Sequence, residues 1–142
     1  MQIVIMELGM NLITFSLFGD NPLYCQGAVE NANLARVIYP EWTARFYVAQ
    51  DVPEDYIKEI EDYGAEVVRC EKKNSYDGLN WRFRPLSSLK VHYWISRDAD
   101  SRLSWRERNA VDEWIESDKS AHLLRDSHNH GYTLSLIHIS EP

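Results

Sequence analysis

Apolar runs typical of buried strands alternate along this chain with segments that have the periodicity of amphipathic helices. The strand-like runs cover residues 11–19, 43–49, 66–70, 91–96 and 121–126. The helical segments lie between Cys25 and Tyr39, between Asp51 and Gly64, and between Ser104 and Ser117. Such alternation is typical of βαβ units, in which helices connect parallel strands. The sequence therefore predicts an α/β fold: a Rossmann-related, mostly parallel sheet with helices on both faces.

The ends of the helices carry their own signals. Pro40 stops the first helix and Gly64 caps the second, while Ser104 and Glu107 form a capping box at the start of the third. The residues expected to face the core are Ile57 and Ile60 in the second helix and Val111, Trp114 and Ile115 in the third.

Charge and cysteine content limit the partners and the setting of the protein. Its 142 residues carry a formal charge of −7 at pH 7, which disfavours nucleic acid or an anionic membrane as the main partner. No apolar stretch approaches the roughly 20 residues of a membrane span. Cys25 and Cys70 form neither a disulfide framework nor a CxxC metal site, so a reduced, cytoplasmic setting is expected.

Both ends of the chain are expected to lie outside the domain, which we assign to residues 10–133. Residues 1–9 are interpreted as an upstream extension if Met10 rather than Met1 is the true start. Residues 134–142, LSLIHISEP, match residue for residue the translation of a transposase sequencing adapter. We therefore expect a non-native tail that packs poorly and contributes no site residue, and a domain that is incomplete at its C-terminus.

Two carboxylates, Asp98 and Asp100, follow the strand-like run VHYWIS after one intervening residue, Arg97. In open parallel sheets, ligands bind beyond the carboxyl ends of the strands. Carboxylates at such an end can hold Mg²⁺ or Mn²⁺, with substrate phosphates filling other coordination positions. The flanking Arg97 and Arg102 are expected to pair with those phosphates or to hold the carboxylates. The competing interpretation is a turn that Asp98 caps and the arginines neutralise.

The segment YWISRDADSRLS, a strand followed by Asp-x-Asp, resembles the DXD motif of GT-A glycosyltransferases. The wider pattern, with NWRFRPLSS and HLLRD, is similar to small glycosyltransferase-like proteins of bacterial polysaccharide loci and phages, over Leu12 to Arg125. The resemblance implies that Asp98 and Asp100 bind a divalent metal and, through it, the diphosphate of a nucleotide sugar. It makes Asp100 the direct metal ligand and places Asp98 near the ribose or sugar. It also brings Arg82 of NWRF close to the donor.

Three of the candidate positions also have a purely structural interpretation. Arg82 either approaches the donor or is an exposed residue whose aliphatic stem covers Trp81 or Phe83. Asp20 and Tyr24 follow the first strand, where the fold that the resemblance implies faces the nucleotide. Either of them contacts the base or ribose, or both belong to an ordinary strand-to-helix cap.

His130, in RDSHNHG, is a further candidate metal ligand. The resembling proteins carry Asp-His-Pro-x-His in this region. Asp126 and His130 fit that pattern, whereas Ser127 and His128 depart from it. The departure weakens the assignment of a metal ligand here.

The predicted function is that of a glycosyltransferase that uses a nucleotide-sugar donor and Mn²⁺ or Mg²⁺. The acceptor-binding half and a carboxylate base normally lie beyond the DXD strand, so the catalytic residues stay unknown and this length of chain is expected to bind a donor without necessarily turning it over. The alternatives are a non-catalytic module that binds a sugar nucleotide or glycan, and another metal-dependent phosphate enzyme such as a nucleotidyltransferase. A nucleotidyltransferase would want a glycine-rich phosphate loop near the first strand, where Gly19 stands alone.

Overall fold

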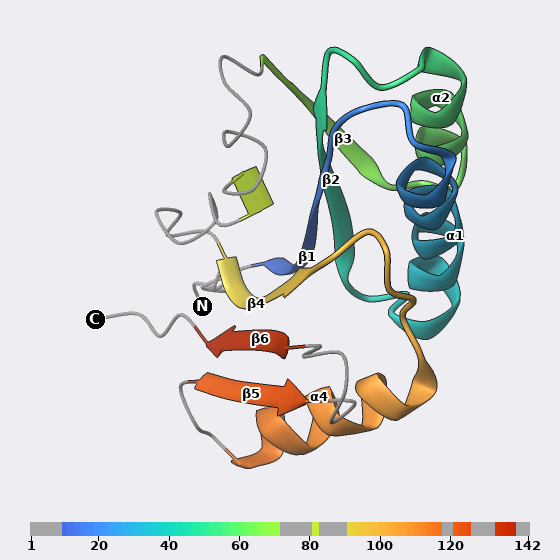
Figure 1. The fold of residues 1–142 in the computed structure, drawn as a ribbon. Coiled ribbons are helices and arrows are strands. Elements are labelled where there is room, and N and C mark those ends of the chain that lie inside the picture. The colour runs from blue at the N-terminus through green and yellow to red at the C-terminus, as the bar shows by residue number, and fades with distance from the viewer. Residues whose placement is uncertain (1–9, 72–80, 83–90, 118–120, 126–132, 139–142) are drawn as a thin grey trace, which may run out of the picture.

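The computed structural model describes residues 10–71, 81–82, 91–117, 121–125 and 133–138. Its strands are β1 (Met10–Leu17), β2 (Thr43–Ala49), β3 (Glu66–Cys70), β4 (Val91–Arg97), β5 (Ala121–Arg125) and β6 (Thr133–His138). Its helices are α1 (Pro22–Ile38), α2 (Glu54–Asp62) and α4 (Trp105–Ser117) (Figure 1). None of these helices is long and apolar enough to cross a membrane.

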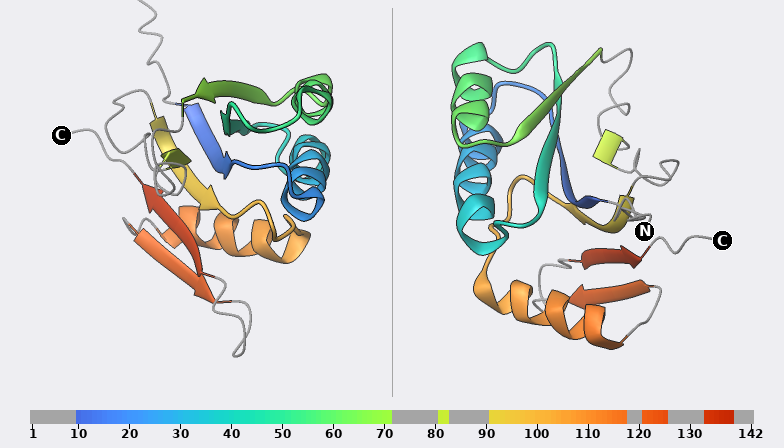
Figure 2. Two further views of the ribbon diagram at one scale, coloured as in Figure 1. Left: turned by 45° about the horizontal axis from the view of Figure 1, so that its top comes forward. Right: turned by 180° about the vertical axis from the view of Figure 1, so that it is seen from behind.

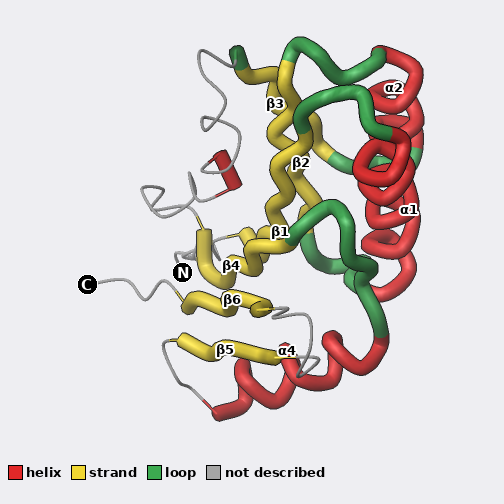
Figure 3. The backbone as a smooth tube through the Cα atoms, in the orientation of Figure 1, coloured by secondary structure: helices red, strands yellow, loops and turns green. Residues whose placement is uncertain are grey.

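The strands form one sheet in the order β3-β2-β1-β4-β6-β5. The first four of these are parallel to their neighbours, whereas β6 runs antiparallel to both β4 and β5. Figure 3 shows β1 between β2 and β4, with the loops that follow β1 and β4 reaching the helical side of the sheet. The prediction of a mostly parallel α/β sheet is confirmed, because each helix between the first strands returns the chain to the same starting edge.

The three long helices pack on the same face of the sheet (Figure 2). That face carries Phe15 and Phe46, whose rings stack with their centroids 4.5 Å apart, and Tyr93, which meets Trp114 of α4 edge-on at 5.2 Å. On the other face a short helical turn at residues 81–82 brings the buried Trp81 against β2 and β3. The sheet is therefore covered unequally, by long helices on one side and by a single turn in the described part of the other.

The helix ends predicted from the sequence are found in the structure. The helix before Pro40 ends at Ile38, and Gly64 adopts the left-handed conformation, with φ of 91°, just after α2. Ser104 Oγ accepts a hydrogen bond of 3.2 Å from the Glu107 backbone N–H at the start of α4. Local signals thus define these ends correctly.

The last described segment overlaps residues 134–142, the expected non-native tail. Residues 133–138 form β6, whose backbone pairs with β4 on one side and β5 on the other. Residues 134–138 therefore join the sheet through their backbone, whereas the expectation that residues 134–142 pack poorly stays a prediction. An apolar segment can satisfy the unpaired hydrogen-bonding groups that β4 would otherwise present at an open edge. Residues 1–9 and 139–142 lie outside the described part of the chain.

Candidate functional site

The acidic turn, residues 98–101, leaves the sheet at the carboxyl end of β4. Its backbone closes through the Ser101 N–H, which donates to the Asp98 carbonyl at 3.4 Å, and through Ser101 Oγ, which donates to the same oxygen at 3.2 Å. Asp98 and Asp100 are exposed, whereas Ala99 between them is buried. Because exposed and buried residues alternate here, both carboxylates point away from the protein interior. They lie at the edge of the sheet that the sequence predicts.

A cavity of about 340 Å³ opens beside this turn. It is lined by Ser16, Leu17, Phe18, Tyr24, Arg82, Asp98, Ala99 and Asp100. One part of this lining is apolar or aromatic and comes from the end of β1 and the start of α1. The other part carries two carboxylates and a guanidinium. The cavity can therefore accept a ligand that has a flat apolar portion joined to a charged one.

Arg82 lies on the sheet face away from the long helices and lines this cavity. Side chains of β1 bind both its backbone carbonyl and its backbone N–H. Thr14 Oγ1 donates to the Arg82 carbonyl at 2.6 Å, and the Arg82 N–H donates to Ser16 Oγ at 2.9 Å. Trp94 Nε1 in turn donates to Thr14 Oγ1 at 2.7 Å. Two hydroxyl side chains on one strand thus fix Arg82 beside the cavity.

The Arg82 guanidinium forms an ion pair with Asp98. Burial lowers the pKa of Arg82 from its usual value, and the charge of Asp100 opposes that effect. Arginine nevertheless keeps its positive charge in proteins. Arg82 therefore places a positive charge beside the two carboxylates, and its approach to a donor stays a prediction.

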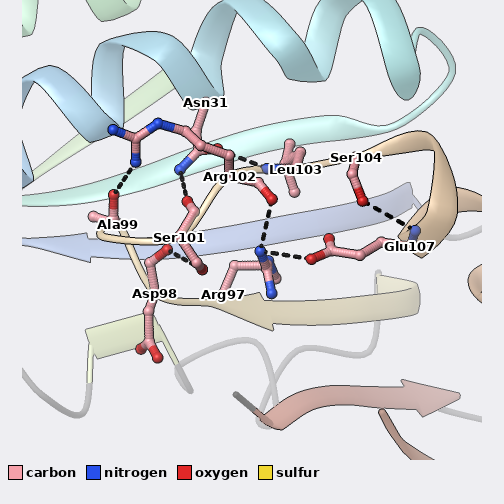
Figure 4. Close-up of polar contacts among 9 residues, drawn as sticks. All are labelled: Asn31, Arg97, Asp98, Ala99, Ser101, Arg102, Leu103, Ser104 and Glu107. Atoms are coloured by element: carbon pink, nitrogen blue, oxygen red, sulfur yellow. Dashed lines mark hydrogen bonds and ion pairs between the residues drawn. The ribbon is translucent and has the colours of Figure 1, made fainter. Parts of the chain in front are cut away.

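Helix α1 holds the other side of the acidic turn (Figure 4). Asn31, which is fully buried, donates from Nδ2 to the Ser101 carbonyl at 2.7 Å and accepts at Oδ1 from the Leu103 N–H at 3.0 Å. Gly27 lies one turn earlier in the helix. A Cβ atom there would stand 2.3 Å from the Ala99 carbonyl oxygen, so only glycine permits the observed approach.

The two arginines that flank the aspartates face the scaffold rather than the cavity. Arg97 is buried and pairs with Glu107 at 2.8 Å, while Arg102 pairs with Glu30 and donates to the Ala99 carbonyl at 3.3 Å. Arg97 and Arg102 thus take Glu107 and Glu30 as their ion-pair partners, and Arg102 holds the backbone between the two aspartates; their expected contact with phosphates stays a prediction. Arg97 follows Ile95 by two positions, so it points to the same helix-covered face of the sheet.

Of the other predicted site residues, one lines the cavity, one does not, and one lies outside the described part of the chain. Tyr24 lines the cavity with 40% of its surface exposed, whereas Asp20 is exposed but is not a lining residue. In the loop after β1, the backbone N–H of Gly19 donates to Asp51 Oδ1 at 2.8 Å. His130, with the rest of residues 126–132, lies outside the described residues.

Sequence reasoning missed Asn31 and Gly27. A signal for Asn31 exists, since it lies three residues after Ala28 and four before Ala35 on the buried face of the helix. A polar residue at such a position requires hydrogen-bond partners inside the protein. The identity of those partners has no local signal, because they follow some 70 positions later in the chain.

The described residues contain no group of three or more histidine, cysteine, aspartate or glutamate side chains that would hold a metal by themselves. The acidic turn offers two exposed carboxylates, one of which pairs with Arg82. Mg²⁺ and Mn²⁺ are commonly bound by one or two carboxylates, with water and substrate oxygens completing the coordination. The site therefore fits a metal that arrives with a phosphate ligand.

Comparison with known proteins gives likeness in structure only. No family model matches the chain, and no curated protein matches it. A 4-diphosphocytidyl-2C-methyl-D-erythritol synthase from Anaerococcus prevotii superposes with a TM-score of 0.53 at 10% identity, over 92% of this chain and 72% of that one. The apo-form glycosyltransferase GlyE of Streptococcus pneumoniae superposes with a TM-score of 0.53 at 15% identity, over 91% of this chain.

The fold is shared with both. This chain spans only 34% of the glycosyltransferase chain, so its likeness to that protein concerns one part of a longer molecule. At such low identities the likeness identifies the α/β sheet and its connections, and says nothing of individual site residues.

Proposed function

We propose that the protein binds a nucleotide sugar in the cavity beside the acidic turn and belongs to a glycosyltransferase. One observation carries the proposal: Leu17, Phe18 and Tyr24 line the same cavity as Arg82, Asp98 and Asp100. An aromatic base can lie against the apolar part. A diphosphate can lie against the charged part, where Arg82 supplies a positive charge and the carboxylates supply metal ligands.

In the proposed transfer, the bond between the sugar's anomeric carbon and the diphosphate breaks, and the acceptor hydroxyl forms a new bond to that carbon. The diphosphate leaves with the electron pair of the broken bond, and the acceptor hydroxyl passes its proton to a general base or to water. Mn²⁺ or Mg²⁺, when bound, would stabilise the negative charge on the leaving diphosphate. Asp98 and Asp100 would hold the metal, Arg82 would bind the diphosphate, and Tyr24 would orient the base.

A nucleotidyltransferase is the second candidate, and one structural neighbour is a 4-diphosphocytidyl-2C-methyl-D-erythritol synthase. That reaction would take a nucleoside triphosphate and release pyrophosphate. The loop between β1 and α1 argues against it, because its sequence, Phe18-Gly19-Asp20-Asn21, contains one glycine where a phosphate-wrapping loop would contain several. A binding module without turnover is the third candidate.

Calorimetric titration of the whole protein with UDP, GDP, CDP and ADP, each with and without Mn²⁺, tests the proposal. We expect one diphosphate to bind much more tightly with the metal. The metal offsets the negative charge of the carboxylates and the diphosphate, and the diphosphate supplies oxygen ligands that two carboxylates leave missing. Asp100→Asn should abolish that coupling and leave the melting temperature unchanged, since Asp100 is exposed. Asp62→Asn, an exposed charge at the end of α2, is the matched control and should retain it.

Titration with nucleoside triphosphates, and an assay for hydrolysis or transfer of nucleotide sugars, separate the alternatives. A nucleoside triphosphate that binds more tightly than every diphosphate would favour the nucleotidyltransferase. Metal-coupled binding of a nucleotide sugar that is never hydrolysed or transferred would favour the binding module. No metal dependence in the wild type, or full dependence in Asp100→Asn, contradicts the proposed site.

A further inference from the structure

One side chain of α1 binds two backbone groups, one in the acidic turn and one just after it. The Asn31 amide donates to the carbonyl of Ser101 and accepts from the N–H of Leu103 (Figure 4). Ser101 closes the turn and Leu103 begins the segment that leads into α4. The two hydrogen bonds therefore fix the backbone immediately after Asp100.

Asparagine is an unfavourable choice for the middle of a helix and for a fully buried position. Asn31 has both properties, with 0% of its surface exposed. Its neighbours on the same face, Ala28, Ala32 and Ala35, already pack α1 against the sheet. The packing of α1 thus has no need of a polar group at this position. The amide instead binds Ser101 at the end of the acidic turn and Leu103 in the loop that follows it.

Gly27 brings the helix and the turn together at the same place. A Cβ atom on Gly27 would stand 2.3 Å from the Ala99 carbonyl oxygen and 2.7 Å from Arg102 Nη1. Ala99 stands between the two aspartates, and Arg102 donates to its carbonyl at 3.3 Å while pairing with Glu30 of α1. The backbone on both sides of Asp100 is therefore anchored to one helix.

We propose that Asn31 is a positioning residue for the metal and diphosphate site, an inference that rests on the proposed function. By fixing the Ser101 carbonyl and the Leu103 N–H, it holds Asp98 and Asp100 in the arrangement that a shared cation requires. A cation that receives only two protein ligands depends strongly on their mutual geometry. Asn31 itself touches neither the metal nor the nucleotide.

The test compares Asn31→Leu and Asn31→Asp with the control Ala32→Gly. The leucine favours the helix and makes neither hydrogen bond, but it is larger than asparagine, whereas the aspartate has nearly the same volume. The aspartate keeps the acceptor for Leu103 and loses the donor for Ser101. Ala32→Gly weakens the same helix without touching the turn, so it reports what mere destabilisation of α1 does. Asn31→Asp serves if the leucine variant fails to fold.

Two quantities are measured in all four proteins: nucleoside diphosphate affinity with and without Mn²⁺, and the exchange rate of the Leu103 amide. We expect the Asn31 variants to lose about 10–100-fold in metal-dependent affinity, the loss typical when a residue supporting metal ligands is removed. Their metal-free affinity should stay unchanged, and Ala32→Gly should keep full coupling. Full coupling in the Asn31 variants, or an equal loss in Ala32→Gly, overturns the proposal.

A failure of the proposed function would look different. The wild type would then show no coupling between metal and nucleotide, and the amide exchange of Leu103 would decide the role of Asn31. Faster exchange in Asn31→Leu, with Ala32→Gly like the wild type, supports a positioning role for another ligand of the same turn. Unchanged exchange in Asn31→Leu overturns it.

Discussion

Nη2 of Arg97 lies 2.8 Å from Oε1 of Glu107, and both side chains are almost completely buried. The pair joins the last residue of β4 to the first turn of α4. It therefore links the strand that ends in the acidic turn to the helix that follows it. Arg97 also donates from Nη2 to the Arg102 carbonyl at 3.2 Å, which ties the pair to the loop between them.

Removing Glu107 should destabilise the whole domain. Glu107→Ala leaves the Arg97 guanidinium buried without its counter-ion, and breaking such a pair costs about 3–5 kcal/mol of unfolding free energy. Urea denaturation measures the loss. Glu66→Ala, which breaks the more exposed pair with Arg45, is the control and should cost about 0–1 kcal/mol. A similar loss in both variants would show that the burial of the Arg97 pair has no energetic consequence.

Gly27→Ala should be destabilising although alanine favours helices over glycine by about 1 kcal/mol. The added Cβ would overlap the Ala99 carbonyl oxygen, so α1 and the acidic turn must separate. We expect a lower melting temperature together with weaker metal-coupled nucleotide binding. Gly64→Ala strains a left-handed backbone far from the turn and should lower stability alone. A stabilised Gly27→Ala protein with normal binding would contradict the close approach.

Arg82→Gln should change the affinities for metal and nucleotide in opposite directions. Without the guanidinium, Asp98 loses its ion-pair partner and becomes a better ligand for Mn²⁺ alone. The diphosphate loses a charged hydrogen bond, worth roughly tenfold or more in affinity. Manganese titration followed by paramagnetic resonance, and calorimetry with the preferred nucleotide, measure the two effects. Arg82→Lys should lie between them, and parallel changes in both affinities would contradict this role.

Tyr24→Ala should weaken the binding of a nucleoside diphosphate more than that of inorganic pyrophosphate. Stacking of a base on an aromatic ring contributes about 1–3 kcal/mol, and pyrophosphate has no base to lose. Tyr24→Phe keeps the ring and should bind almost as the wild type does. Competition titrations measure both ligands, and an equal loss for the two would place the base elsewhere in the cavity.

Glu41 should make a pH-dependent contribution to stability through its ion pair with Arg108. Burial is the largest single influence and raises the pKa of Glu41. The hydrogen bond to Arg108, a backbone hydrogen bond and the charge of Arg108 together outweigh it, so the pKa lies below the usual 4.5. A depressed pKa in the folded state gives stability that is present above pH 4.5 and is lost as the pH falls through the folded value. The stability difference between wild type and Glu41→Gln, measured by urea denaturation, should therefore shrink with acid. A constant difference down to strongly acidic pH would contradict it.

The sequence alone predicts most of the sheet, because strand and helix periods are local properties of the chain. The runs 43–49 and 66–70 coincide with β2 and β3, and the turn after β4 lies at the sheet edge where two aspartates were expected. The parallel direction of β1, β2 and β3 also follows from local patterns, because a helix between two strands returns the chain to the same edge of the sheet.

The surroundings of the aspartates are decided only in the tertiary structure. Asn31 and Ser101 are separated by 70 positions in the chain. Arg82 lies beside Asp98 because Thr14 and Ser16 of β1 bind its backbone. Glu107 has a complete local explanation as part of a capping box, yet it pairs with Arg97 across the core. Local patterns fix which residues form each element, whereas a polar side chain takes its partner from whatever element the folded chain places beside it.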